Sequence, residues 1–507
     1  MFPPAPIATF EPLEPRRLLD GELNIDRGGD AGHLPPAAGL DMVMHWDRVL
    51  IEVLRADRTL PGPGWSSRNM AITSLAVFDT VNAFGHEYQP YLVKLRAPRG
   101  ASRDAAVAAA AHRALSRLYP DQQTFLDTKL NQSLAMVPDG PGETMGVMLG
   151  RYVADRIVEA REDDGSSDVV EYTLNPAPGH WEPDYLNPSQ TAWGPGWGQV
   201  EPFALRSGDQ FRAPPPPQLD SAAYARAFNE VKSLGEKHST TRTAEQTEIG
   251  IFWAYDRAGT GSPPALYCQA VETIAIQNHN TLVQNARLLA LVNVAMADAG
   301  IAAWDTKYVY DYWRPISGIR RADEDNNPLT VADPTWTPLG APGDGPGGSI
   351  PDFTPPFPAY TSGHATFGAA VFRVLASFYG TDRMHFALQS DELPGVRRSY
   401  HRFSQAAAEN GRSRIYLGIH WQFDNVMGQR QGRAVADYVF RNILQRQGRH
   451  GVQREDVDLH ELALPSGAPT DRDQHTGGIT KLSGAVITSL LSMPGVSQDV
   501  EDLWLKV

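Results

Sequence analysis

The sequence predicts a mainly α-helical globular protein. Apolar residues recur at helical spacing through most of the chain, whereas the alternation that is typical of strands is scarce. The Ala-rich stretch Arg103–Leu118 is a clear helix that Pro120 ends. With 507 residues, 42% apolar and 21% charged, the chain is long enough for one large or two ordinary cores. Periodicity alone therefore indicates an all-α protein of one or two domains.

The remaining elements follow from the same periodicity and from Pro and Gly. Residues 41–95 form two helical stretches separated by P-G-P-G-W. Further helices are expected at Gln122–Met136, Thr144–Glu162, Ala222–Leu234, Thr243–Trp253, Phe403–Ile415, Leu417–Leu444 and, in the tail, Ile479–Met493. Leu266–Tyr312 reads as one very long helix or two broken near Gly300. Asp164–Pro217, which contains W-G-P-G-W-G, is a long loop region of the kind that is functional or wraps the surface.

The N-terminal segment and the charge balance constrain partners and location. Met1–Gly39 is rich in Pro, Gly and charge, so we expect it to be poorly ordered. Nowhere do 18 apolar residues follow one another, and this predicts no membrane span. Phe10–Gly21 resembles the LEPR-XLL segment of exported planctomycete proteins, which favours export or the cell envelope over a soluble cytoplasmic location. The net charge of −14 argues against nucleic acid or an acidic membrane as a partner.

Three minor features have structural interpretations. Cys268 is the only cysteine, which excludes an intrachain disulfide and predicts a buried thiol. Arg321–Pro328, R-A-D-E-D-N-N-P, suggests calcium, but its spacing does not fit an EF-hand loop, and a solvated acidic turn is favoured. His180 is expected to be a surface or packing residue.

The segment around Ser362-Gly363-His364 predicts an anion site. A Pro-rich approach ends at Ser362, and small and apolar residues then recur at the spacing of a buried helix, so the tripeptide lies at a helix N-terminus. Free N–H groups and the helix dipole favour an oxyanion there. Ser362 adds a hydroxyl donor, Gly363 permits close approach, and His364 would face the anion as an acid or base.

Two other segments supply cations and a second histidine. Lys307 and Arg314 are seven residues apart, so one helix ended by Pro315 would project both from one face. A straight helix would place Arg414 and His420 about 120° apart, so they converge only if Gly418 marks a break or if Arg414 reaches along the axis.

A carboxylate accompanies the second histidine. Asp424 follows His420 by four residues, on the same helical face, where it could fix the imidazole tautomer. Three cations, a helix start and two histidines predict a site for a tetrahedral oxyanion.

Together these segments resemble the signature of the vanadium-dependent haloperoxidases and the type 2 phosphatidic acid phosphatases. The signature consists of Lys307 with Arg314-Pro315, Ser362-Gly363-His364, and Ser413-Arg414 with His420 and Asp424. The spacing inside each part is kept. Thr361 stands where the family usually has Pro, which removes no ligand.

Residues outside the signature favour the haloperoxidase branch. Trp304 and Phe357 match positions on the halide side of chloroperoxidase-like pockets, and Asp256 in F-W-A-Y-D also resembles that branch. The resemblance runs from about Gly250 to Asp437. It implies two helical bundles side by side with the oxyanion site in the C-terminal one, and domains at 1–40 (N-terminal segment), 41–240, 241–445 and 446–507 (tail).

The resemblance also implies a mechanism. Vanadate as V(V) would be bound by His420 through Nε2, with donors to its oxygens from Lys307, Arg314, Ser362, Gly363 and Arg414. His364 would take a proton from hydrogen peroxide, and Lys307 would polarise the peroxide oxygen that the halide attacks. The product would be hypohalous acid or an equivalent.

Two alternatives use the same residues. In a phosphomonoesterase the cations hold phosphate, His420 attacks phosphorus to form a phosphohistidine, and His364 protonates the leaving alcohol. An exported binding protein would keep the anion site without turnover. The intact set of donors argues against the second alternative.

Overall fold

The described part of the chain is mainly helical, as the sequence predicts. The computed structural model describes residues 40–57, 62–343 and 350–447 of the 507. The LEPR-XLL-like stretch, the rest of residues 1–39 and the expected helix at 479–493 lie outside these residues.

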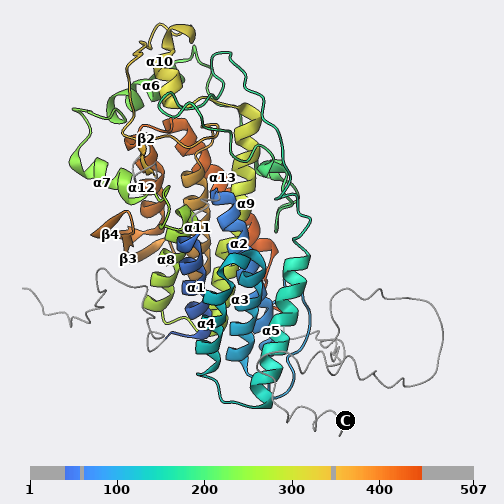
Figure 1. Cartoon of the computed structure of the whole chain (residues 1–507). Coiled ribbons are helices and arrows are strands. Elements are labelled where there is room, and N and C mark those ends of the chain that lie inside the picture. Colours follow the sequence, from blue (N-terminus) through green and yellow to red (C-terminus); the bar gives the residue numbers. More distant parts are fainter. Residues whose placement is uncertain (1–39, 58–61, 344–349, 448–507) are drawn as a thin grey trace, which may run out of the picture. The chain divides into compact units, whose positions relative to one another are not determined.

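The helices shown in Figure 1 begin and end close to the expected positions in most cases. They are α1 (Met42–Ala56), α2 (Pro63–Gly85), α3 (Arg103–Leu118), α4 (Gln123–Leu134), α5 (Pro141–Glu159), α6 (Ala222–Leu234), α7 (Ala244–Phe252), α8 (Ser262–Gln277), α9 (Leu282–Tyr310), α10 (Pro315–Arg320), α11 (Gly363–Tyr379), α12 (Phe403–Tyr416) and α13 (Gln422–Asn442). Two antiparallel strand pairs accompany them, β1 (Ala341–Gly343) with β2 (Ile350–Phe353), and β3 (Arg383–Ser390) with β4 (Leu393–Arg402).

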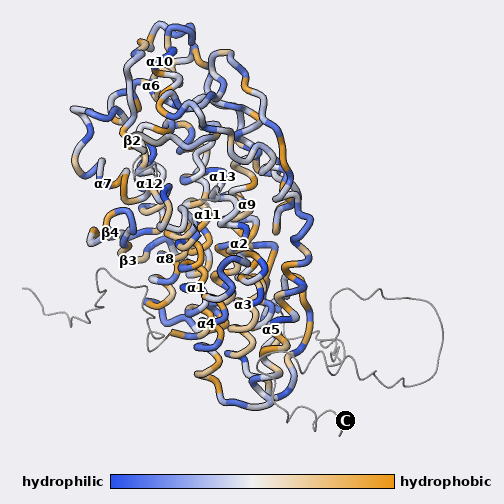
Figure 2. Tube along the Cα trace, viewed as in Figure 1, coloured by the Kyte–Doolittle hydropathy of each residue, from blue (hydrophilic) through white to orange (hydrophobic). Residues whose placement is uncertain are grey.

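Helix α9 is the central element of the fold. It packs against α2 on one side and against α11 and α13 elsewhere, and most of its residues are buried. Among the described helices it alone is long and apolar enough to cross a membrane, but 94% of its most apolar window is buried inside the protein. Figure 2 shows apolar stretches recurring along its neighbours α1, α2 and α8. The helix that carries Lys307 is therefore a core helix.

Neither alternative for Leu266–Tyr312, one very long helix or a break near Gly300, is correct. Helix α8 ends at Gln277, and α9 starts after Thr281, whose side chain accepts from Gln284 N while Gln284 bonds back to the Thr281 backbone. This capping box fixes the start of α9. Gly300 lies inside α9, where a Cβ would come within 2.9 Å of the Phe367 ring. The glycine serves close packing between α9 and α11 and does not end a helix.

A β-hairpin between α11 and α12 was not expected. Strands β3 and β4 pair from Arg383 with Arg402 to Ser390 with Leu393. In β3 the side chains of Phe386 and Leu388 are buried and their neighbours are more exposed, a period of two within one short strand. The pattern covers too few residues to stand out among long helices.

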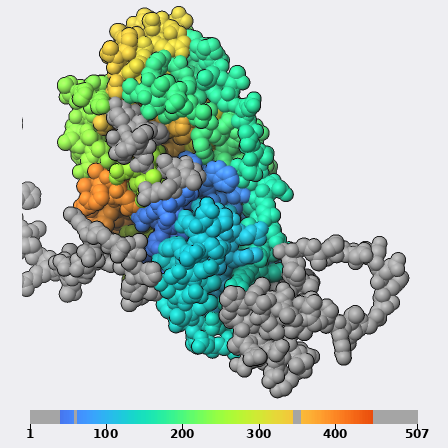
Figure 3. Space-filling view, viewed as in Figure 1, coloured from blue at the N-terminus to red at the C-terminus, as the bar shows by residue number. Residues whose placement is uncertain are grey.

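The long loop region wraps the outside of α9. In residues 160–221 the chain forms only the short 3₁₀ turns η2 (Trp197–Gln199) and η3 (Gly208–Phe211), and both contact α9. Figure 3 shows this region as the green surface along one side of the molecule. The prediction of a long loop that wraps the surface is confirmed.

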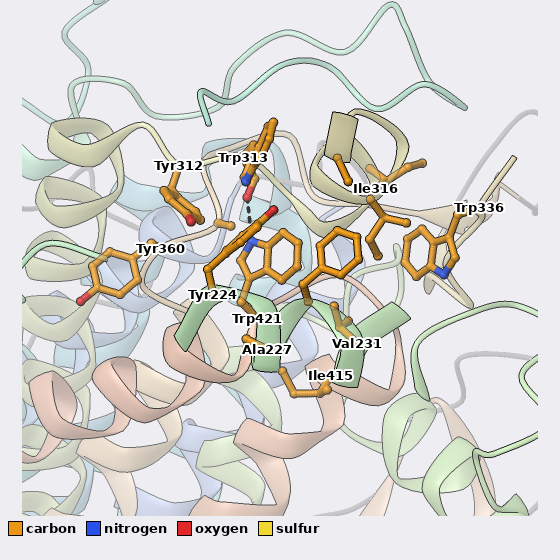
Figure 4. Close-up of a cluster of buried hydrophobic side chains, with 14 of the residues drawn as sticks. Tyr224, Ala227, Val231, Tyr312, Trp313, Ile316, Trp336, Tyr360, Ile415 and Trp421 are labelled. Atoms are coloured by element: carbon orange, nitrogen blue, oxygen red, sulfur yellow. Dashed lines mark hydrogen bonds between the residues drawn. The ribbon is translucent and has the colours of Figure 1, made fainter. Parts of the chain in front are cut away.

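An aromatic cluster supports the segments that carry the candidate site. Trp313, Tyr360 and Trp421 are buried together with residues of α6 (Figure 4). Trp421 Nε1 donates to the Trp313 carbonyl at 3.0 Å. Because Arg314 follows Trp313 and His420 precedes Trp421, this packing fixes two site residues by their backbone neighbours.

Candidate active site

Lys307 lies in the last turn of α9 and is fully buried. Its Nζ donates to the carbonyls of Pro358, at 2.7 Å, and Ala359, at 3.1 Å. Burial, and then the charge of Arg314, lowers the pKa of Lys307 well below its usual range. A bound anion would counter both effects and favour the charged ammonium.

The expectation that one helix carries both Lys307 and Arg314 is wrong. Helix α9 ends at Tyr310 because Asp311 takes the left-handed conformation with φ 50°, and Arg314 is the N-cap residue of α10. The two cations still meet. Arg314 donates through Nε to Phe357 O at 2.9 Å and through Nη1 to Ile419 O at 2.8 Å. Burial lowers the pKa of Arg314 to about 9.

The Ser362-Gly363-His364 tripeptide opens a helix as predicted. Ser362 is the N-cap of α11 and accepts from Ala365 N at 3.4 Å, which leaves its own hydroxyl hydrogen free to donate. Its backbone N–H donates to Asp424 O at 3.1 Å. The ideal Cβ of Gly363 would lie 3.5 Å from the Trp304 ring, so this helix start packs directly on the aromatic side of the site.

His364 is oriented by a backbone carbonyl. Its Nε2 lies 2.8 Å from Ala254 O, which can only accept, so Nε2 carries the proton and Nδ1 has the free lone pair. Burial, followed by the charge of Arg414, lowers the pKa of His364 to about 4. The imidazole is therefore neutral near pH 7 and able to accept a proton through Nδ1.

A break in the chain at Gly418 allows Arg414 and His420 to lie in one site. This is the first of the two possibilities that the sequence left open. Helix α12 stops at Tyr416, and Gly418 has φ +75°. Arg414 Nη2 pairs with Asp256 Oδ2 at 2.7 Å. Asp256 is therefore the ion-pair partner of a site arginine.

His420 and Asp424 contact each other, but not across one helical face. Helix α13 begins only at Gln422, with Trp421 as N-cap, so the expected shared face is wrong. Asp424 Oδ2 accepts from Trp421 N at 3.0 Å and lies 2.8 Å from His420 Nδ1. The carboxylate therefore keeps the proton on Nδ1, which leaves Nε2 as the acceptor, 2.9 Å from Arg314 Nη1.

The cations surround His420. Burial, and then the charges of Arg314, Lys307 and Arg414, lowers the pKa of His420 well below its usual range. Burial raises the pKa of Asp424 to about 7. Three basic groups, Lys307, Arg314 and Arg414, thus surround His420, and a bound anion would favour the charged form of each.

Donors remain unused in this cluster. Within the described residues, Arg314 Nη2, Arg414 Nε and Arg414 Nη1 are buried and have no hydrogen-bond partner. A buried unpaired donor costs about 1–3 kcal/mol. Guanidinium groups match the geometry of oxyanions such as phosphate. The residues present therefore fit a tetrahedral oxyanion such as vanadate or phosphate.

Aromatic rings form one side of the cluster. The Trp304 and Phe357 rings are 4.9 Å apart, and Lys307 Nζ lies 5.6 Å and 5.0 Å from their respective centres. The sequence analysis missed Trp193, whose ring lies 5.1 Å from that of Trp304. The repeated Trp and Gly residues of W-G-P-G-W-G were the sequence feature that could have drawn attention to Trp193. Its contact with Trp304 could not be predicted, because only the fold creates it.

The three minor features of the sequence make local contacts. The turn at 321–328 is solvated only in part, because Asp325 is buried and accepts from Asn327 N and Thr330 Oγ1. His180 Nδ1 lies 2.9 Å from Asp311 Oδ2. Cys268 is buried and donates to Asn293 Oδ1 at 3.1 Å.

The chain belongs to the vanadium haloperoxidase family. It is 30% identical over 495 residues to the vanadium chloroperoxidase of Curvularia inaequalis, a match that covers 77% of this chain and 80% of that protein. Residues 287–448 match the VCPO second helical-bundle domain. The relatives are peroxidases, so this chain is homologous to enzymes.

Solved structures agree with this assignment. A bacterial vanadium-dependent iodoperoxidase superposes with a TM-score of 0.66 at 25% identity, covering 80% of this chain and 97% of that one. A bacterial vanadium-dependent chloroperoxidase in its holo form shares the fold, with a TM-score of 0.56 at 17% identity over 81% of this chain and 94% of that one.

Proposed function

We propose that this protein is a vanadium-dependent haloperoxidase that oxidises a halide with hydrogen peroxide, giving hypohalous acid or an equivalent. The observation that carries the proposal is a set of buried guanidinium nitrogens on Arg314 and Arg414 that have no hydrogen-bond partner among the described residues. They lie next to a histidine whose Nε2 is held as an acceptor. Such a set suits an oxyanion that also needs one nitrogen ligand.

Each residue has a role in holding the cofactor. His420 Nε2 is the proposed ligand of vanadium, and Asp424 holds its tautomer. The donors to the vanadate oxygens are Lys307, Arg314, Ser362, Gly363 and Arg414. Bound vanadate would supply a V(V) Lewis acid that activates hydrogen peroxide without changing its own oxidation state.

The remaining chemistry is assigned to the protein. His364 Nδ1 accepts a proton from the incoming peroxide. Burial keeps this imidazole neutral, and the negative charge of a bound anion would raise its pKa and so favour proton uptake. Lys307 stays charged beside the bound anion and polarises the reacting oxygen. These fixed charges act in a buried site, where they are worth more than in water.

We further propose that the halide approaches over Trp304 and Phe357. Their rings give a halide a partly desolvated wall beside the Lys307 ammonium. Phe357 leads us to propose that chloride is accepted as well as bromide. Asp256, which pairs with Arg414, would restrain that cation on the halide side.

We propose the two-bundle arrangement for this architecture. Helices α2, α3 and α5 pack on one another, and so do α9, α11, α12 and α13, with α9 also contacting α2. The proposed division falls near residue 240, with the site in the C-terminal bundle.

The test uses halogenation and phosphatase assays in parallel. Metal-free protein receives hydrogen peroxide, bromide and a dimedone-type acceptor before and after orthovanadate, and p-nitrophenyl phosphate is tested alongside. Halogenation that requires vanadate is the expected result. Cleavage of the phosphate ester without metal, with vanadate acting only as an inhibitor, would instead identify a phosphatase that uses His420 as nucleophile.

A further inference from the structure

Two glycine–tryptophan motifs interlock beside the proposed site. One is Gly62–Trp65 at the start of α2, and the other is Trp193–Gly198 in the long loop. A Cβ on Gly62 would lie 2.0 Å from the Trp193 ring, and one on Gly64 would lie 2.4 Å from the Trp197 ring. No larger residue fits at either glycine without displacing a tryptophan. The start of α2 thus clamps the loop in place.

The clamped loop lies directly on the aromatic wall. Trp193 contacts Trp304 edge-on, with ring centres 5.1 Å apart, and contacts Phe357 with ring centres 6.3 Å apart. The Trp193 backbone is fixed as well, since its N–H donates to Pro356 O at 2.8 Å and its carbonyl accepts from Tyr308 Oη and Trp304 Nε1. Trp193 therefore closes a triad of rings whose other two members are the proposed halide wall.

We propose that Trp193 is a positioning residue that determines which halides the enzyme oxidises, by holding the Trp304 and Phe357 rings together. This inference rests on the proposed haloperoxidase function. Trp193 contacts both rings, and its backbone is hydrogen-bonded to Pro356 and to Tyr308 of α9. Its bulk therefore limits how far the Trp304 and Phe357 rings can separate. Rings held this close together beside the Lys307 ammonium favour a small ion.

Halide chemistry makes this constraint selective. Chloride is smaller and more strongly hydrated than bromide or iodide, so its transfer into an apolar site costs more and needs closer contacts in return. Changes in the fit of an apolar pocket typically alter selectivity about 10- to 200-fold. Loosening the triad should therefore penalise chloride most and iodide least.

Trp197 provides a matched control. It belongs to the same loop, is buried, and packs on Trp65 at 5.5 Å and on Trp193 at 5.7 Å. No ring contact between Trp197 and either Trp304 or Phe357 is found in the described structure. Trp197→Phe thus disturbs the packing of the same loop without removing a ring that contacts Trp304 or Phe357.

The experiment compares wild type, Trp193→Phe and Trp197→Phe, loaded with vanadate. For each protein, kcat and KM are measured with chloride, bromide and iodide, and vanadate affinity is measured by titrating the metal-free form. Trp193→Phe is expected to raise the iodide-to-chloride ratio of kcat/KM about tenfold, mainly through KM for chloride. Its vanadate affinity should stay within about threefold of wild type, and Trp197→Phe should keep the wild-type ratio. Trp193→Tyr serves as a second variant if the first does not fold.

Two outcomes would overturn the inference while leaving the proposed function intact. The halide ratio of Trp193→Phe could equal that of wild type, or Trp197→Phe could shift it equally, which would show an effect of loop packing alone. A wild-type protein that binds vanadate but halogenates with none of the three halides would remove the proposed function, and the inference with it.

Discussion

Two kinds of buried polar groups in this protein have opposite hydrogen-bonding states. Asp79 in α2 accepts from three consecutive backbone N–H groups, those of Tyr91, Leu92 and Val93, at 2.7–2.9 Å. Asp298 in α9 accepts in the same way from residues 203, 204 and 205. Each carboxylate is saturated and clamps a loop to a helix.

Two and a half turns after Asp298, α9 delivers Lys307 to a cluster whose donors exceed its acceptors. Arg314 and Arg414 keep three buried guanidinium nitrogens without partners within the described structure. The difference shows how structural and functional buried charges can be separated. A saturated group stabilises the fold, whereas surplus donors that converge on one histidine require a ligand to complete them.

The largest expected effect comes from removing the histidine at the centre of the unsaturated cluster. His420→Ala deletes the proposed ligand, so vanadate affinity should fall more than about 100-fold and vanadate-dependent halogenation should disappear. Titration of the metal-free protein measures the affinity. His112→Ala is the control, because His112 is also buried and also pairs with an aspartate, at 2.7 Å, but lies in α3. Full turnover by His420→Ala would rule out its role.

A comparison of Arg414, which has unpaired nitrogens, with the fully paired Arg398 tests the same distinction. Arg414→Lys keeps the charge but loses the forked donors, so vanadate affinity should fall about 10- to 100-fold, equivalent to about 1.5–3 kcal/mol for a charged hydrogen bond. Arg398 is the saturated counterpart, since it donates to Glu409 through Nε and Nη2 and to Glu248 through Nη1. Arg398→Lys should lower stability in urea unfolding and leave vanadate affinity unchanged. Equal losses of vanadate affinity in both variants would contradict the distinction.

Sequence reasoning identified the charged residues of the site but not how the backbone brings them together. Spacing alone placed Lys307 and Arg314 on one helix, and no residue type signalled that Asp311 would take a left-handed conformation and end α9 first. The contact between His420 and Asp424 was predicted, although it forms at a helix start and not along a helix. The helix start at Ser362 was predictable because capping is local in sequence.

Trp193 marks the limit of such reasoning. It lies 111 residues from Trp304, and only the folded chain brings the two rings together. Local sequence patterns predict helices and their caps. Contacts between residues more than 100 positions apart depend on tertiary packing, which a single sequence does not reveal.

A smaller effect, on stability alone, is expected at the saturated carboxylates. Asp298→Asn retains one acceptor oxygen and turns an NH₂ toward backbone donors, which should lower the free energy of unfolding by about 1–3 kcal/mol. Vanadate affinity should change less than about threefold, because no site residue bonds to Asp298 directly. Urea unfolding and vanadate titration measure the two quantities. Asp437→Asn, at a partly exposed pair with Arg373, is the control and should change stability by less than about 0.5 kcal/mol.

Glu392, beside the β3–β4 turn, is a buried charge that fits neither class, and it gives the smallest expected effect. Its carboxylate is fully buried and lies 2.7 Å from Arg257 Nε. Burial raises the pKa of Glu392 from 4.5 to about 7, against the opposing effect of Arg257. The folded chain therefore holds a proton up to about pH 7 that the unfolded chain releases near pH 4.5, so wild-type stability falls as the pH rises through this interval.

Glu392→Gln imitates the protonated form and removes that dependence. The free energy of unfolding of the variant, relative to wild type, should therefore rise by about 1 kcal/mol between pH 5 and pH 8. The expected rise is small because the partly exposed Arg257 stabilises the ionised carboxylate of the wild type. Urea unfolding of both proteins at the two pH values measures the difference. A difference that stays constant with pH would show that Glu392 is ionised throughout and that its ion pair with Arg257 offsets the cost of burial, which would place it with the saturated carboxylates.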